Sequence, residues 1–594
     1  LCVGSSRDVP AQRAPRESVF ARALAPCFTS ACVCPLASPP AAMAKRQVTL
    51  LRKIGTDIQG PGQLDRNSVL SAFASGNKER ITATLKRVAA SGQQAAAFNL
   101  VEPVGRLLAH QDDDVCKAAL DAWGNMGEVG VRFADDVGEH VLKHPSAPCR
   151  AAALEALGKM GLALSRASRQ QVISRLVDDE PSVRQAAVRA LIALGATASA
   201  KAVQGVLGDA SPGVRGAAIE ALGYFVAASE EVESSFGLET LRKPLLDLLK
   251  NGSTRCSALI AVQYLADKAP SECVDIVVDA LGDKDGPTRE AAAAAVGAMR
   301  AAVSQSSGAM RAVEAHLRSS ETAVRAAAAV GVGAMGTEAA SLAGAVAELL
   351  TDESEDTSAL AAQVGATARR APAVLRLPRA AAAAALGRLG DSSYVDNITS
   401  RLADASWEVR LVACEALGSF GPAATGEADS ILGMLDDDAY PVRAAVCAAL
   451  GEIGNPQACE GLIERFKDKA HTVRLSAVVA VGKLGADASE YTHDVFKMLD
   501  DRAAPVQAAA AISLSKLGEN GLNYAGVLAN MAYEAEPEVR IGALTALGGM
   551  GRHGAALAAE IAERAQGDPH PAVRRTAEAA LAALGSRAVS APGA

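Results

Sequence analysis

Apolar and small residues recur at helical spacing from about residue 110 to the C-terminus, in the same order each time. The clearest copy spans residues 402–421 and holds an Asp, a short turn, Val-Arg, several small residues and Leu-Gly. Apolar positions three and four residues apart predict that the second half of each copy is a helix. An apolar segment before the Asp predicts a first helix, joined to the second by a tight turn. Such a unit cannot bury its apolar face alone, so the copies should stack.

The Arg of Val-Arg sets the register of the copies, and we call its place the signature position. Most copies follow one another after 31 to 36 residues, but two intervals are longer, 40 and 54 residues. We therefore predict an all-α, right-handed superhelical α-solenoid of about fourteen two-helix repeats. The signature positions are Cys116, Arg150, Arg184, Arg215, Arg255, Arg289, Arg325, Arg379, Arg410, Arg443, Arg474, Gln507, Arg540 and Arg574.

An acidic residue stands six positions before the signature Arg in eight copies. The acid can cap the second helix by accepting hydrogen bonds from its free N–H groups. The Arg lies one turn further in and can reach an acid or a carbonyl group of the same or the adjacent repeat. Because these residues recur wherever the fold recurs, we interpret them as a structural ladder rather than an anion-binding groove. The predicted ladder consists of Asp178, Arg184, Asp209, Arg215, Asp283, Arg289, Asp404, Arg410, Asp437, Arg443, Asp468, Arg474, Glu534, Arg540, Asp568 and Arg574.

The pattern Asp-x-x-x-x-Val-Arg-x-Ala-Ala-x-x-Ala-Leu-Gly-x-Leu-Gly resembles the short HEAT-like repeats first described in phycobilisome lyases. The resemblance covers residues 110–585 and implies an armadillo-like helical solenoid. Repeats of this kind serve in lyase subunits, adaptors, transport receptors and assembly scaffolds, so the fold alone does not fix a function. A related hydroxylase of deoxyhypusine binds two irons through His-Glu pairs. None of the eight histidines here is followed by Glu, which disfavours that activity.

Composition narrows the function classes further. The net charge of -8 and the pI near 5.7 argue against binding to nucleic-acid phosphates. No run of 18 uncharged apolar residues predicts a membrane span. The 11 cysteines lack paired zinc-type spacing, and His140 and His144 lie four apart without a third ligand nearby in sequence. The sequence has no nucleophile beside a base and no phosphate-binding loop. We therefore expect no cofactor and favour a protein without catalytic activity, but whether it is an enzyme stays open.

The chain divides into six predicted segments. The first is a leader that lacks the repeat, is poor in acids and resembles an organellar transit peptide. It could equally be translated sequence before a true start at Met43. The location is accordingly predicted to be cytoplasmic, or plastid or mitochondrial if the leader is a transit peptide. The segments are a disordered leader 1–58, capping helices 59–105, repeats 106–350, an inserted loop 351–377, repeats 378–586 and a disordered tail 587–594.

Function is expected where the array departs from its own consensus. The 54-residue interval contains about 20 extra residues in an enlarged turn, which either contributes to binding or is a tolerated surface loop. Trp407 occupies a place where other copies have Pro, Ala or Ser, and exposed Trp is enriched at binding hot spots. The candidate partner-binding residues are Trp407, Asp352, Glu353, Glu355, Asp356, Arg369 and Arg370.

The sequence therefore favours a scaffold or adaptor that binds one or more proteins along the concave surface of the solenoid. The alternative is a subunit of a bilin lyase or a chromophore-protein assembly factor, and only in that case would a tetrapyrrole be bound. A third hypothesis is a transport receptor that holds a basic segment on an acidic inner face. A neutral or basic inner face would argue against it.

Overall fold

The computed structural model describes residues 65–91, 99–108, 110–127, 131, 134–139, 141–161, 164–236, 238–355, 373–534, 536–568 and 570–590. In this part of the chain all regular elements are α- or 3₁₀-helices, and the predicted all-α solenoid of stacked two-helix repeats is confirmed. Fourteen helices carry the signature positions, and we call them the inner helices. They are α6 (Asp113–Asn125), α8 (Ala147–Lys159), α10 (Pro181–Ala193), α12 (Pro212–Ala228), α15 (Arg255–Leu265), α17 (Gly286–Ala298), α20 (Thr322–Met335), α24 (Pro378–Leu389), α26 (Trp407–Ser419), α28 (Tyr440–Ile453), α30 (His471–Leu484), α32 (Ala504–Leu514), α35 (Pro537–Gly549) and α38 (Pro571–Ser590).

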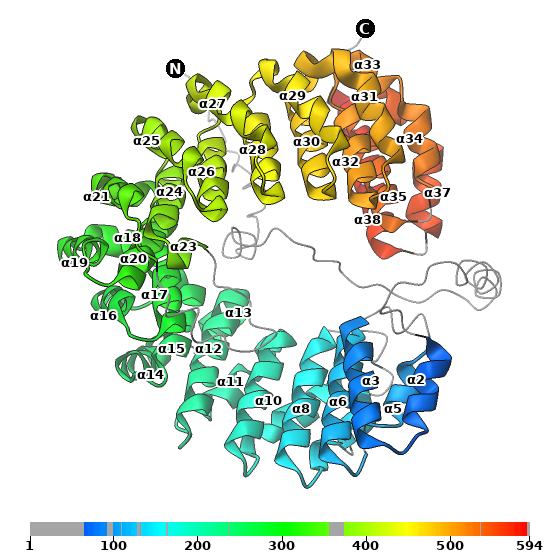
Figure 1. Cartoon of the computed structure of the whole chain (residues 1–594). Helices are drawn as coiled ribbons and strands as arrows, with labels where there is room; N and C mark the ends of the chain where they lie inside the picture. The colour runs from blue at the N-terminus through cyan, green and yellow to red at the C-terminus, as the bar shows by residue number, and fades with distance from the viewer. Residues whose placement is uncertain are drawn as a thin grey trace, which may run out of the picture.

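The repeats form an open arc in which the inner helices line the concave side (Figure 1). Shorter elements lie on the convex side, and α2, α3 and α5 precede α6 at the N-terminal end. α38 continues to Ser590, four residues beyond the expected end of the repeats, because no Gly or Pro follows Gly585 before Pro592. The remaining α-helices are α2 (Arg66–Phe73), α3 (Lys78–Ser91), α5 (Val101–Gly105), α7 (Ala134–Glu139), α9 (Arg166–Ser174), α11 (Ala200–Gln204), α13 (Glu230–Phe236), α14 (Glu239–Lys250), α16 (Cys273–Asp279), α18 (Arg300–Gln305), α19 (Ser307–Leu317), α21 (Ala343–Glu348), α23 (Ala373–Arg376), α25 (Val395–Thr399), α27 (Ala428–Leu432), α29 (Cys459–Glu464), α31 (Thr492–Lys497), α33 (Gly518–Leu522), α34 (Ala525–Met531), α36 (Arg552–Ala555) and α37 (Ala558–Gly567).

Many outer elements are a short α-helix flanked by 3₁₀ turns rather than one continuous helix. The segment 421–436, for example, consists of η13 (Gly421–Glu427), α27 and η14 (Gly433–Asp436). A unit of 31 to 36 residues uses 11 to 20 of them for its inner helix, so few remain for the outer one. The tighter 3₁₀ turns let this short segment span the width of the repeat, because they rise about 2.0 Å per residue instead of about 1.5 Å.

The inner helices begin and end where the sequence places Pro and Gly. Pro441 occupies the first turn of α28, where its missing N–H leaves no hydrogen bond unmade. Gly454 ends the same helix in the left-handed conformation, with φ 76° and ψ 28°, and donates to the carbonyl oxygen of Leu450. A residue with a Cβ would be strained there. A closing Gly with positive φ therefore stops most of the inner helices and turns the chain back to the outer side.

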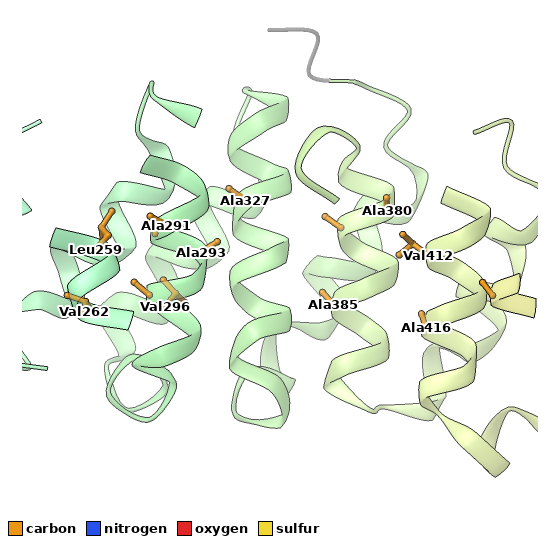
Figure 2. Packing of buried hydrophobic residues seen from close by; sticks show 14 of the residues in the cluster. Leu259, Val262, Ala291, Ala293, Val296, Ala327, Ala380, Ala385, Val412 and Ala416 are labelled. Atoms are coloured by element: carbon orange, nitrogen blue, oxygen red, sulfur yellow. The ribbon is translucent and has the colours of Figure 1, made fainter. Parts of the chain in front are cut away.

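Small residues allow the inner helices to pack closely against one another (Figure 2). A methyl group added at Gly333 of α20 would lie 2.8 Å from the Cα of Ala385 in α24, which is closer than a Cβ can come. Ala327, Ala380 and Ala416 are likewise almost completely buried between inner helices. The high Ala content thus sets the spacing of the repeats, and one continuous apolar core runs through the array.

One stretch within the described residues, Thr322–Thr351, is long and apolar enough to cross a membrane by length and composition alone. In the fold it is divided into α20, η9 (Gly336–Leu342), α21 and η10 (Leu349–Thr351), with Gly336 at φ 63° between the first two. α20 packs between α17 and α24, and Arg325 within it belongs to the ladder. Its apolar character is therefore explained by its place in the core of the array.

Candidate functional site

The signature arginines join consecutive repeats through their guanidinium groups. Arg410 donates from Nε and Nη2 to the two carboxylate oxygens of Asp437 in the next repeat, at 2.7 and 2.9 Å. Its Nη1 donates to the carbonyl oxygens of Asp404 and Ala405 in its own turn, at 2.9 and 3.4 Å. One side chain therefore ties two turns together. The same two-pronged contact with the following Asp is made by Arg150, Arg184, Arg379, Arg443, Arg474 and Arg540.

The ladder aspartates do not cap the inner helices in the way the sequence suggested. Asp404 Oδ1 accepts a hydrogen bond from the N–H of Ser406 at 2.9 Å, and Ser406 is itself the N-cap residue of α26. Asp437 accepts in the same way from Ala439 at 2.8 Å. Each carboxylate therefore forms an Asx turn ahead of the helix instead of reaching the N–H groups inside it. Its position is set by the Arg of the preceding repeat, which holds both oxygens.

Hydrogen bonds from arginine lower the pKa of two ladder carboxylates, Asp209 and Asp501, although burial opposes this. The side chains of Arg474 and Asp501 expose only 5% and 7% of their surface. Burial alone would raise the pKa of Asp501, but the hydrogen bonds from Arg474 and from the N–H of Ala503 outweigh it, and the pKa lies below its ordinary value. For Asp209 the hydrogen bonds from Arg184 are the main cause of a lowered pKa. These groups are occupied by the protein itself, so the geometry describes a spine between repeats.

The ladder is interrupted where one partner is missing. Gln507 reaches only the carbonyl oxygen of Asp501, at 2.5 Å from its Nε2. Arg215 donates to carbonyl oxygens of its own turn, and among the described residues no carboxylate accepts from it. Leu249 stands six residues before the next signature position, where most repeats have an acid. These joints lack the ion pair that links most of the other repeats.

The insertion enters the array inside the ladder. Arg325 donates from Nε to Asp352 at 2.8 Å, and Arg379 Nη1 approaches the carbonyl oxygen of Asp352 at 3.5 Å. Asp352 is therefore the ladder acid of the repeat that contains α24, although it precedes the signature Arg by 27 residues instead of six. The inserted residues follow this Asp and precede the inner helix. The sequence predicted that Asp352 lies in the inserted loop, because the acid of most other repeats stands six residues before the signature Arg.

The other predicted binding residues near the insertion differ in their surroundings. Glu355 is bound by Arg376, whose side chain is only 1% exposed and also bonds to Glu408. Glu353 is exposed. The remaining three predicted residues of the insertion, Asp356, Arg369 and Arg370, lie outside the described residues. The short helix α23, which ends at Arg376, lies within the segment predicted to be a loop.

Two large aromatic side chains are exposed at the start of neighbouring inner helices. Trp407, the first residue of α26, is 40% exposed, and Tyr440, the first residue of α28, is 53% exposed. Each stands three residues before its signature Arg. Sequence reasoning singled out Trp407 and missed Tyr440, although the repeat register assigns both to the same place. Both side chains are open to contact with another molecule.

The inner helices leave one row of side chains open on the concave side, and we call it the inner stripe. It consists of the residues one, five and nine positions after each signature position, of which Gly216, Ala326, Ala380 and Ala508 are buried. Five positions after the signature residue, the row is apolar from Ile260 to Ala384, and Ala448 continues it after Glu415. Ala294 and Ala448 are exposed, and Ile260, Val330 and Ala384 are half-buried. Short side chains here make the concave surface shallow. Such a surface can contact another molecule over a long path without first displacing long charged side chains.

The charge on the inner stripe is balanced. Its seven basic residues are Lys117, Lys159, Arg189, Arg388, Lys483, Lys516 and Arg575, and its six acidic residues are Asp121, Glu155, Glu220, Glu290, Glu415 and Glu452. Desolvation against the neighbouring helices also raises the pKa of Glu220. The face therefore lacks the acidic character that the transport-receptor hypothesis requires for holding a basic segment. The net charge of -8 of the whole chain resides elsewhere.

With the stacked pairs and the ladder in place, the class of protein is an all-α solenoid of stacked two-helix repeats. The family model of HEAT repeats matches residues 134–223, 169–255, 372–445 and 428–515. HEAT repeats are therefore present on both sides of the insertion. No curated protein matches the sequence.

Two solved structures show the particular proteins that this chain resembles in fold. The complex of Kap95 with Nup1 contains a chain with a TM-score of 0.57 and 15% identity, covering 92% of this chain and 80% of that one. Yeast importin-β, Kap95p, has a TM-score of 0.54 and 11% identity, covering 88% of this chain and 84% of that one. At such low identity the likeness extends to the fold alone.

Proposed function

We propose that this protein is a scaffold or adaptor that binds another protein along its concave surface and performs no chemistry itself. The observation that carries the proposal is the inner stripe, in which exposed or half-buried apolar residues such as Ile260, Ala294 and Ala448 alternate with charged residues of both signs. An exposed apolar surface of this length, bordered by charges, is typical of a protein-binding face. The solenoid of the Kap95:Nup1 complex, which is similar in fold, also bears a protein partner.

The mechanism would be multivalent contact along successive repeats. Each inner helix adds a small patch, and the ladder keeps neighbouring patches at fixed separations, so a rigid partner can meet several of them at once. The exposed pair Trp407 and Tyr440 would act as an anchor at the edge of this face. The balanced charge points to a partner that presents apolar surface rather than a strongly basic segment.

The test compares the inner face with the convex face. Ala294→Glu and Ala448→Glu introduce charge at exposed positions of the inner stripe, where no cavity or overpacking results. Asn397→Glu in α25 makes a matched change on the outer side. Proteins bound by the intact chain would be identified by cross-linking and mass spectrometry. The proposal requires that both inner variants lose the same partners and that Asn397→Glu retains them. Equal retention by all three variants would refute it.

The finer assignment to repeats of the phycobilisome-lyase type is also a proposal. It is supported by the Asp and Val-Arg signature and by the short, broken outer helices of the compact unit. Under it, the alternative function is a bilin-lyase subunit or chromophore-protein assembly factor, with a tetrapyrrole or its acceptor protein on the concave face. Co-purification of a coloured tetrapyrrole under light-harvesting conditions would favour this alternative over the scaffold. The location stays predicted as cytoplasmic, or plastid or mitochondrial with a transit peptide.

A further inference from the structure

The first joint of the ladder replaces its ion pair with a different pair of side chains. Cys116 stands at the signature position, and His144 stands six residues before Arg150, where most repeats have the ladder acid. His144 imitates that acid, because its Nδ1 accepts a hydrogen bond from the N–H of Ser146 at 3.1 Å, two residues further on. Cys149 occupies the position before the signature residue, which is Val in most repeats. The joint thus substitutes thiols and an imidazole for a guanidinium and a carboxylate.

These side chains meet at the N-terminal ends of α6 and α8. One ligand atom each from Asp113, His144 and Cys149 lies within 4.8 Å of the others. Cys116 lies one helical turn after Asp113 and outside this group of three, and its thiol donates to the carbonyl oxygen of Leu108 at 3.0 Å. A tetrahedral zinc site with bonds of about 2.0 to 2.3 Å has edges of about 3.3 to 3.8 Å. Closure of the group of three around an ion therefore requires movements of about 1 Å, and Cys116 would exchange its bond to Leu108 for a bond to the ion.

Both thiols are buried, and Cys116 stands where most repeats have the signature Arg. A divalent cation bound here would supply the positive charge that Arg provides at most other joints. The Oδ2 atom of Asp113 is fixed by the hydroxyl group of Ser146, so one hard ligand is already oriented.

We propose that Cys116, His144, Cys149 and Asp113 bind a single structural Zn²⁺ that closes the joint between α6 and α8. Two thiolates, one imidazole and one carboxylate complete a tetrahedral set, and such a closed set leaves no position for a reacting water. The imidazole nitrogen that now accepts from Ser146, or the second nitrogen after rotation of the ring, supplies the nitrogen ligand. The ion would take the place of the Arg–Asp contact and hold the first repeat against the second.

The test uses the full chain, incubated with Zn²⁺ in the presence of a mild reductant and then freed of unbound metal. Elemental analysis should find about one zinc per chain, and removal of the zinc by a chelator should lower Tm. Replacement of Zn²⁺ by Co²⁺ should give the intense d–d bands of a tetrahedral site and a thiolate-to-metal charge-transfer band. The double variant Cys116→Arg/His144→Asp rebuilds the Arg–Asp pair of the other joints. It should fold with unchanged helix content and bind no zinc.

Two further variants separate metal binding from folding. Cys149→Val restores the residue that most repeats have and should also lose zinc while remaining folded. Cys447→Val removes a buried thiol far along the array and should retain zinc in full. The proposal is overturned if the intact chain retains no zinc, or if the double variant binds as much zinc as the intact chain. It is equally overturned if mass spectrometry of protein purified without reductant shows a Cys116–Cys149 disulfide that zinc and reductant cannot convert to a metal site.

Discussion

Truncation of one ladder arginine should destabilise the array far more than truncation of Gln507, which stands at a signature position without an ion pair. Arg474→Ala removes two charge-assisted hydrogen bonds to Asp501, at 2.7 and 2.8 Å, and a bond to the carbonyl oxygen of Asp468 at 2.9 Å. The carboxylate left behind is 7% exposed. Breaking a buried pair by removing one partner costs about 3 to 5 kcal/mol, because the remaining charge is buried without compensation.

The chain supplies its own control at the following repeat. Gln507 makes a single hydrogen bond to the carbonyl oxygen of Asp501, so Gln507→Ala should cost about 0.5 to 1.5 kcal/mol. Arg474→Gln should fall between the two, since Gln can keep the carbonyl contact but cannot hold the carboxylate. The three variants therefore separate the contribution of the ion pair from that of the carbonyl contact.

The assay is urea unfolding combined with amide hydrogen exchange. Repeat arrays can unfold in parts, so the exchange of the Ala503 N–H, which bonds to Asp501 at 2.9 Å, reports on this joint directly. Arg474→Ala should accelerate that exchange more than Gln507→Ala does. If both variants lower the free energy of unfolding equally, the ladder contributes no more than a neutral hydrogen bond and the reasoning fails.

Three further results are expected. The free energy of unfolding should fall as pH drops from about 5 through the ordinary Asp pKa of 3.8. Asp209 and Asp501 have lowered pKa values in the folded chain, so the unfolded chain binds protons first. Acid titration followed by circular dichroism should show a shallower loss for Arg474→Ala. Ala266→Gly should raise the free energy of unfolding by about 1 kcal/mol, since Ala266 has φ 48° and ψ -123°, and an unchanged Tm would contradict this. Deletion of 351–372 should lower Tm because it removes Asp352, whereas deletion of 357–371 should leave Tm unchanged.

The sequence was enough to predict the repeat, its two helices and the positions that define its register. Those properties are local, because apolar spacing, Pro in the first turn and Gly at the end of the helix act within one repeat. Since the repeat recurs, the same prediction applies along the chain. The same register accounts for the burial of Trp123, at 0% exposure, and of Cys414 and Cys447 in the core. The outer segments were harder, because short units favour 3₁₀ turns that apolar spacing does not distinguish.

The tertiary structure decided which side chains meet across repeats. Most signature arginines bond to the Asp of the following repeat and to carbonyl groups of their own turn, and the acid forms an Asx turn instead of the predicted helix cap. Asp352 belongs to the ladder although an insertion separates it from its repeat, and Asp113 meets His144 and Cys149 only because α6 and α8 stack. Contacts of this kind depend on how the repeats pack in space. The sequence pattern therefore identifies the residues that take part but does not show which of them pair.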